Sequence, residues 1–230
     1  MTDFRAELLK SPVPLFPLPN CVLLPGAVLP LNIFEPRYRR MIGELLEHEE
    51  DERLIAIALL KDGFEPLYET NHAEIHPVVC VGRILHHERL GDGRYNILLL
   101  GCCRASVVAE DTSGEYRLAS LAPLDSEGSL EEPEVAQQLA RVLSRAVELK
   151  VCGGELVKML VDAAPTLPCL VDLVAFHFIP GSESSLKQRI LEDRNVCSRK
   201  NLVIRWLTGL LARAKRNLHR SFDHKNRSVN

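Results

Sequence analysis

Two hydrophobic patterns divide the chain near residue 125. Ahead of this point, short apolar runs alternate with Gly, Asp and Ser, whereas beyond it apolar residues recur every three or four positions. Short apolar runs between turn residues are typical of β-strands, and a 3.6-residue period is typical of amphipathic helices. The sequence therefore predicts an α+β protein, with strands in the first part and helices in the second.

Five apolar runs in the first part are predicted strands, at residues 53–60, 77–87, 94–100, 102–110 and 116–124. Leu90-Gly91-Asp92-Gly93 is a strong turn signal between the second run and the third. Gly101 separates the third run from the fourth, where a β-bulge is expected. Both faces of residues 95–100 are partly apolar, which indicates that neither face is freely solvated. Short strands joined by turns predict a barrel.

Residues 13–41 are almost continuously apolar but contain six prolines, Pro14, Pro17, Pro19, Pro25, Pro30 and Pro36. Proline has no backbone N–H, fixes its own φ and pushes the preceding residue toward extended geometry. Short extended pieces at the edge of a barrel therefore fit this segment better than a helix or a central strand. Pro36 suits the first turn of a helix, and the apolar spacing predicts this helix over residues 36–47.

The polar sequence of residues 125–133 is the predicted domain boundary. Beyond it, helices are predicted at residues 135–149, 156–161, 167–179, 184–193 and 197–218. We therefore assign a barrel with one helix to residues 12–124 and a helical bundle to residues 133–218. The two ends of the chain, residues 1–11 and 219–230, are expected to be flexible.

Composition favours a cytoplasmic protein without a cofactor or a metal. The seven cysteines are odd in number and form no C-x-x-C pair, which favours reduced thiols over a zinc site. The first residues lack the basic and then apolar architecture of a signal peptide. No apolar run approaches the roughly 18 residues that would span a bilayer. The expectation is a soluble, cytoplasmic protein.

The net charge of −3 conceals a strong asymmetry. From Arg199 onward there are nine lysines and arginines and a single acid, so this tail carries +8 and the preceding residues −11. The predicted last helix places Arg205, Arg213 and Arg216 opposite its apolar stripe. This face is either solvated or a surface for a protein or a phosphate-bearing partner. Its only aromatic residue, Trp206, falls near the apolar side, so nucleic acid is the less favoured partner.

The sequence lacks the patterns of several enzyme classes. There is no G-x-x-x-x-G-K-[ST] phosphate-binding loop. Ser184 and Ser185 lie close to Lys187, but a Ser–Lys dyad also needs an oxyanion hole. His72 and His76 flank a glutamate at the wrong place for a zinc protease, and the proline that follows opposes a helix. A Cys–His hydrolase, whose residues meet only in space, stays an open alternative.

Three charged residues are predicted to have structural roles. Asp172 is the only acid in an apolar helix, and a buried carboxylate must be paired. Its expected partner is a backbone N–H or an arginine of the first segment. Glu35 and Arg37 are expected to pin the barrel to the first helix rather than to act as acid and base.

The segment PLFPLPNCVLLPG, followed by LPLNIFEPRYRRM, resembles the opening signature of the Lon N-terminal domain family. Gly82, Gly101 and Arg104 stand where that family has a recurring strand, hairpin and G-x-x-R element. Further along, LPCLVDLVAFHF resembles its buried helix, and its Lys-Gln…Leu-Glu…Arg segment corresponds to Lys187, Gln188, Leu191, Glu192 and Arg199. The resemblance covers residues 12 to about 211. It implies a PUA-like β-barrel followed by a C-terminal helical bundle, in a domain that recognises protein substrates.

The resemblance implies a non-catalytic, ATP-independent protein of quality control that recognises exposed apolar or misfolded polypeptide segments. An ATP-dependent protease is its candidate partner, because these 230 residues contain neither the ATPase nor the Ser–Lys protease module of complete Lon proteases. Phe34 and Tyr38 are predicted to contact peptide, in a shallow apolar groove between barrel and bundle. The alternatives are nucleic-acid binding through the basic last helix and an unrecognised Cys or His hydrolase.

Overall fold

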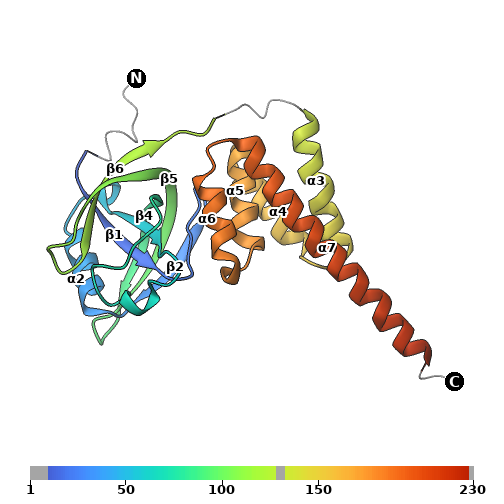
Figure 1. Cartoon of the computed structure of the whole chain (residues 1–230), viewed down its shortest axis with the longest axis horizontal. Helices are drawn as coiled ribbons and strands as arrows, with labels where there is room; N and C mark the ends of the chain where they lie inside the picture. Colours follow the sequence, from blue (N-terminus) through green and yellow to red (C-terminus); the bar gives the residue numbers. More distant parts are fainter. Residues whose placement is uncertain (1–9, 128–132, 228–230) are drawn as a thin grey trace. The chain divides into compact units, whose positions relative to one another are not determined.

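The structure, a computed structural model, describes residues 10–127 and 133–227 and divides into two compact units (Figure 1). Unit 1 comprises Met1–Ser126 and Ile179–Arg194, and unit 2 comprises Glu127–Phe178 and Asn195–Asn230. No helix in the described ranges is both long and apolar enough to cross a membrane. The predicted flexible segment 1–11 lies mostly outside the described residues.

Unit 1 is built on six strands, β1 (Val13–Leu18), β2 (Val28–Ile33), β3 (Leu54–Leu59), β4 (Val78–Arg89), β5 (Tyr95–Asp111) and β6 (Arg117–Leu124). The pairings β1–β3, β3–β4, β4–β5, β5–β6 and β6–β1 form a closed cycle, so the sheet curls into a ring. Only β2 stands outside this cycle, because it pairs with β5 alone among the described strands. The predicted α+β fold class, with a strand-rich first part, is confirmed.

The long strand β5 holds this arrangement together. One side of it pairs with β4, and the other side pairs first with β2, through residues 95–100, and then with β6, through residues 104–111. The change of partner falls at Gly101, where the register against β4 also shifts. A side chain at Gly101 would overlap the backbone oxygen of Leu24, so only glycine allows this close approach. The sequence predicts two strands here, and the structure has one bulged strand.

Strand β1 is a central strand in spite of its two prolines, which corrects the prediction of an edge piece. It pairs with β6 only through residues 13–15 and with β3 only through residues 15–18. Pro14 therefore has a partner strand on the β6 side alone, and Pro17 on the β3 side alone. Each proline has one open side, on which a missing N–H removes no ladder hydrogen bond.

The interior of unit 1 is filled by aliphatic side chains. A continuous cluster of fully buried residues includes Leu15, Val79, Val81, Ala105 and Ala119, and Phe64 and Tyr68 pack against its edge. Helix α2 (Pro36–Leu45) covers another part of the interior with Tyr38, Met41, Ile42 and Leu45. Within the described ranges, three single turns of 3₁₀ helix connect the elements, at Glu50–Glu52, Glu65–Leu67 and Gly181–Glu183.

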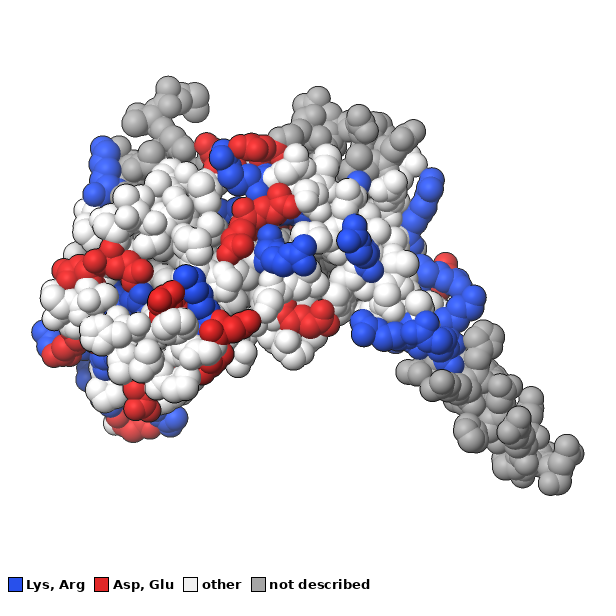
Figure 2. Space-filling view, in the orientation of Figure 1, with Lys and Arg blue, Asp and Glu red and all other residues white. Residues whose placement is uncertain are grey.

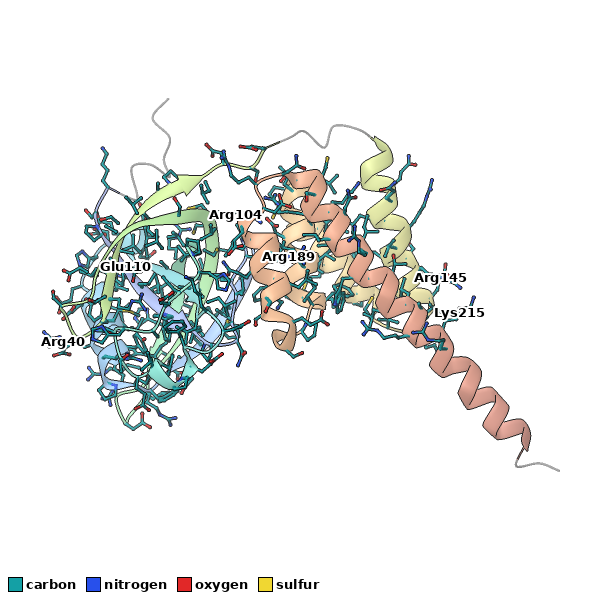
Figure 3. The ribbon with its side chains drawn as sticks, viewed as in Figure 1. Arg40, Arg104, Glu110, Arg145, Arg189 and Lys215 are labelled. Carbon is teal, nitrogen blue, oxygen red and sulfur yellow. The ribbon has the colours of Figure 1, made fainter. Side chains whose placement is uncertain are left out.

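Helix α6 (Ser184–Glu192) belongs to unit 1 although it lies far from the strands in sequence. The buried Arg104 of β5 reaches it and donates from Nε to the carbonyl oxygen of Leu191 at 3.0 Å (Figure 3). Gln188 donates from Nε2 to the carbonyl oxygen of Val78 in β4 at 2.8 Å. A cation near the last carbonyls of a helix is favourable, because these oxygens have no partner within the helix. The sequence places this helix in the bundle, so its place in unit 1 was not foreseen.

The described part of unit 2 consists of four helices, α3 (Pro133–Glu148), α4 (Gly154–Ala163), α5 (Leu167–Phe178) and α7 (Val196–Arg227). Buried leucines and valines of α3, α5 and α7 form its core, among them Leu139, Leu143, Val171, Val203 and Leu207. Helix α7 continues to Arg227, whereas the sequence predicts flexible chain from residue 219. No proline or glycine follows Gly209 to stop it.

Replacing Gly101 by alanine is expected to lower the free energy of unfolding by about 2 kcal/mol or more, because the methyl group meets backbone that cannot turn aside. Gly91→Ala in the β4–β5 turn is the matched control, since its methyl group meets nothing within 4 Å. The control should change stability by less than about 0.5 kcal/mol. Urea unfolding followed by circular dichroism measures both, and equal stability of the two variants would contradict the close approach at Leu24.

Replacing Arg104 by methionine is expected to cost about 2 kcal/mol, because a charged donor to the end of α6 is lost and buried carbonyl oxygens are left without it. Arg189→Met is the control, since Arg189 is exposed on the same helix. Hydrogen exchange should accelerate in α6 for the first variant and stay unchanged for the second. Equal protection of α6 in both variants would show that Arg104 does not hold this helix.

Candidate functional site

An apolar surface lies on the outer side of strands β2, β5 and β4. The register aligns Val28 with Leu100, and aligns Pro30 with Leu98 and then with His86. Residues directly opposite each other in an antiparallel sheet share a face. Leu98 is 37% exposed and Val28 39%, whereas their neighbours Ile97 and Leu99 point inward and are buried. We call this surface, made by Val28, Pro30, Leu98 and Leu100, the β2–β5–β4 face.

The sequence predicts that neither face of residues 95–100 is freely solvated, and the structure buries one face fully and the other in part. Leu98 is the most exposed of these outward side chains, since Asn96 and Leu100 beside it are half-buried. An exposed apolar cluster on a sheet is unfavourable in water and commonly marks a binding surface. The β2–β5–β4 face is therefore the candidate site.

A hollow of about 440 Å³ forms one end of this face. Its lining combines apolar and polar side chains of three strands, namely Pro30, Leu31, Asn32, His86, Glu88, Asn96, Ile97 and Leu98. The polar side chains form a row across the strands. Asn32 donates from Nδ2 to Oδ1 of Asn96 at 2.7 Å, and Asn96 donates from Nδ2 to Oε2 of Glu88 at 3.2 Å. Asn96 thus orients one oxygen of the Glu88 carboxylate, and Asn32 in turn orients the amide of Asn96.

The free edge of β2 is poorly suited to accept another strand. Gly101 donates its N–H to the oxygen of Ala27 at 2.8 Å, so odd-numbered residues of β2 bond to β5 and even-numbered residues face outward. One of the outward positions is Pro30, which has no N–H to offer. A peptide strand added to this edge would find a gap in its ladder. Side-chain contact on the face is therefore favoured over strand addition.

A second hollow, of about 690 Å³, lies between β1, α2 and β6. Tyr116 donates its hydroxyl to Glu44 at 2.5 Å at its wall, and Arg40 donates to the same carboxylate at 2.8 Å. Burial and the bond to Glu44 raise the pKa of Tyr116 to about 12. The hydroxyl of Tyr116 therefore stays protonated and bonded to Glu44, so it is not available as a base. The hollow is lined partly by Lys10 and Ser11, the first described residues.

The two predicted peptide contacts have different environments. Phe34 directly follows β2 and is 62% exposed, as a contact residue needs to be. Tyr38 is only 2% exposed, and its ring packs against Phe16 with centroids 4.2 Å apart. Burial raises the pKa of Tyr38 to about 12 against the opposing effect of Arg37. Tyr38 is a core residue, so it presents no surface to a partner. The groove predicted between barrel and bundle stays a prediction.

Glu35 and Arg37 form a compact ion pair at 3.0 Å at the start of α2. Tyr68 donates its hydroxyl to the other oxygen of Glu35 at 2.6 Å, and Arg37 donates to the backbone oxygen of Tyr68 at 2.8 Å. Burial, and after it the bond to Glu35, raises the pKa of Tyr68. The two charges therefore attach α2 to the loop after β3, and we propose a structural role for both.

Asp172 is buried in α5, and its Oδ1 lies 3.6 Å from Nε of the fully buried Arg199 of α7. The partner is thus an arginine of the last helix, which corrects the expectation of one from the first segment. Removal of one member of a buried ion pair is costly, because the other charge stays in a low-dielectric interior.

The basic residues of α7 are exposed as predicted from their spacing. Arg205, Arg213 and Arg216 lie on its solvated side, and Lys and Arg gather there together with Lys215 (Figures 2 and 3). No aromatic side chain is exposed with them between residues 196 and 216, and Trp206 is half-buried. Stacking aromatics supply much of the binding to single-stranded nucleic acid. This face therefore has positive charge that can attract phosphates, but between residues 196 and 216 it has no exposed aromatic side chain on which a base could stack.

Two observations concern the cysteines and histidines of the described ranges. No group of three His, Cys, Asp or Glu side chains is placed to hold a metal ion there. Burial raises the pKa of the Cys21, Cys102, Cys152 and Cys169 thiols. A nucleophilic cysteine needs the opposite shift, toward thiolate. Of the sequence predictions, Phe34 is exposed near the candidate site, while Leu98 and Glu88 were missed.

Comparison with known proteins gives consistent results in sequence and in structure. The chain is 28% identical over 214 residues to Lon protease 2 of Sorangium cellulosum and 25% identical over 209 residues to Lon protease of Anaeromyxobacter dehalogenans. These alignments cover 84% and 87% of this chain but 24% and 23% of the relatives. The chain thus spans about a quarter of the length of the curated relatives that it matches.

Two solved structures share the fold. The N-terminal domain of Mycobacterium avium complex Lon protease has a TM-score of 0.62 and 19% identity, covering 86% of this chain and 98% of that one. The Lon N-terminal domain protein from Xanthomonas campestris has a TM-score of 0.60 and 22% identity, covering 85% and 98%. The sequence profile of the ATP-dependent protease La (LON) substrate-binding domain matches residues 12–209. Since that match takes in nearly the whole chain, the protein belongs to the Lon substrate-binding domain family.

Proposed function

We propose that this domain recognises polypeptides through exposed apolar segments, and that the β2–β5–β4 face is the surface that receives them. The family's description as a substrate-binding domain supports a recognition role. The observation that carries the choice of surface is the exposure of Val28 and Leu98 on strands whose opposite face fills the core. Apolar side chains that are exposed to water on one side of a sheet contribute favourable free energy to binding when a partner covers them.

The face would bind mainly by side-chain burial. Full burial of a leucine or valine contributes about 1.5 kcal/mol or more. Two or three such side chains give the moderate affinity that suits a domain which has to sample many unfolded clients. Phe34, exposed directly after β2, is proposed as a further contact. The proline on the outward edge of β2 supports contact on the face over strand addition.

Recognition here is proposed to be non-catalytic and to need no nucleotide. The raised pKa values of four thiols and the occupied hydroxyl of Tyr116 support this, since neither group is prepared as a nucleophile or base. The relatives that match are Lon proteases, which supports a proteolytic partner in protein quality control. Bound clients would then be passed to an ATPase and protease module supplied by such a partner.

Replacing Leu98 by aspartate is expected to weaken binding of an unfolded client about tenfold, because a charged group then faces the apolar ligand and about 1.5 kcal/mol of burial is lost. The measurement is fluorescence anisotropy with a reduced, alkylated and dye-labelled protein. Val108→Asp is the matched control, since Val108 is 67% exposed at the other end of the same strand. It should bind as the wild type does.

Circular dichroism and thermal unfolding first establish that both variants are folded. If Leu98→Asp and Val108→Asp lower the affinity for the client equally, the client binds to exposed apolar side chains in general and not to one defined site. An unaltered affinity of folded Leu98→Asp would place recognition elsewhere on the domain. Phe34→Ser is expected to reduce affinity less than Leu98→Asp, because Phe34 lies beyond the hollow and outside the β2–β5–β4 face.

A further inference from the structure

Glu88 is an oriented carboxylate beside an apolar hollow, and its charge has no basic partner among the described residues. Its one hydrogen bond there comes from the amide of Asn96, which in turn accepts from Asn32. An amide donor orients a carboxylate but does not neutralise it. The carboxylate lines the same hollow as Pro30 and Leu98, so an apolar ligand in that hollow would lie next to a negative charge.

We propose that the β2–β5–β4 face selects polypeptide segments in which an apolar residue has a lysine or arginine close to it on one side. This inference rests on the proposed function and names the class of client that the same surface favours. The apolar side chain would occupy the hollow over Leu98, and the cation would meet Glu88. Charge complementarity at a partly apolar surface contributes more to choice of partner than to total affinity.

The amides of Asn32 and Asn96 strengthen the attraction between Glu88 and a cation of the client. Asn32 and Asn96 each donate in the same direction, so their dipoles align toward the carboxylate. A side chain that is already oriented loses less conformational entropy when a cation arrives than a free glutamate would. A carboxylate in a client segment would instead be repelled. The row therefore distinguishes cationic from anionic flanks of an apolar segment.

The other end of the face carries the opposite charge, which limits the ligand to one cationic side. Arg83 is aligned with Leu100, whereas Glu88 is aligned with Asn96. These two positions on β5 are four residues apart, which is about 14 Å along a strand. A segment with cations on both flanks would place one of them near Arg83. The favoured client is therefore apolar with a single basic flank rather than polybasic.

The test uses three peptides of equal length with acetylated and amidated ends, identical except at one position after an apolar pair. That position holds lysine, acetyl-lysine or glutamate. Fluorescence anisotropy with the whole protein should give about threefold to fivefold tighter binding of the lysine peptide than of the acetyl-lysine peptide. The glutamate peptide should bind least. The preference should shrink at high salt, because the ion pair lies near the surface.

Glu88→Gln should abolish the preference, so that the lysine and acetyl-lysine peptides bind with equal affinity. Glu69→Gln is the control, since Glu69 is an exposed carboxylate of unit 1 away from the hollow. It should keep the full preference. A preference that survives Glu88→Gln would overturn the assignment to Glu88, and no preference in the wild type would overturn selection of a cation altogether.

Two further outcomes separate this inference from the proposed function. If Leu98→Asp weakens all three peptides and Glu88→Gln changes none, apolar recognition at this face stands and the inference is wrong. If neither variant changes any affinity, the face is not the site and both are wrong. A peptide with a free amino terminus serves as the last arm. A Glu88-dependent gain for it, without one for lysine, would mean that a terminal ammonium is selected in place of a side chain.

Discussion

The change of partner along β5 is the constraint on which unit 1 depends. One strand closes the ring by pairing with β6 and, at its other end, carries β2 outside the ring. This geometry requires a kink where the partners change, and the kink brings β5 so near Leu24 that no side chain fits at Gly101. The same geometry leaves β2 with one unpaired edge among the described strands and leaves Val28 and Leu98 partly exposed on the outer side of the sheet. The candidate site is thus a consequence of how the sheet closes.

Long-range polar contacts complete this unit. Arg104 lies on β5 just beyond Gly101 and donates to carbonyl oxygens at the end of α6, which follows it in sequence by some eighty residues. Glu35, Arg37 and Tyr68 do the same for α2 and the loop after β3. Each contact joins elements that the apolar core alone would leave free to slide, because aliphatic packing is not directional.

The candidate site illustrates how far a sequence can identify a binding surface. Phe34 and Tyr38 look equivalent in sequence, as aromatic residues in one apolar segment, yet Phe34 is exposed and Tyr38 stacks on Phe16 in the core. The sequence gives no sign that Leu98 is more exposed than the leucines beside it, because residues 97–100 are all apolar and only the pairing with β2 and β4 decides which of them point outward. The role of Glu88 has no signal in the sequence, because its carboxylate is oriented by Asn96 and, through it, by Asn32, and these residues meet only through the register of three strands.

The sequence by itself determined the α+β class, the positions of most strands and helices, and the family, since these follow from local hydrophobic periodicity, turn residues and a long characteristic segment. Only the tertiary structure decided the rest. It made β1 a central strand by staggering its two ladders, placed α6 with the strands through Arg104, and gave Asp172 its partner in Arg199. It also separated exposed from buried side chains on β5. These outcomes depend on contacts between residues far apart in the chain, and a local sequence pattern does not specify such contacts.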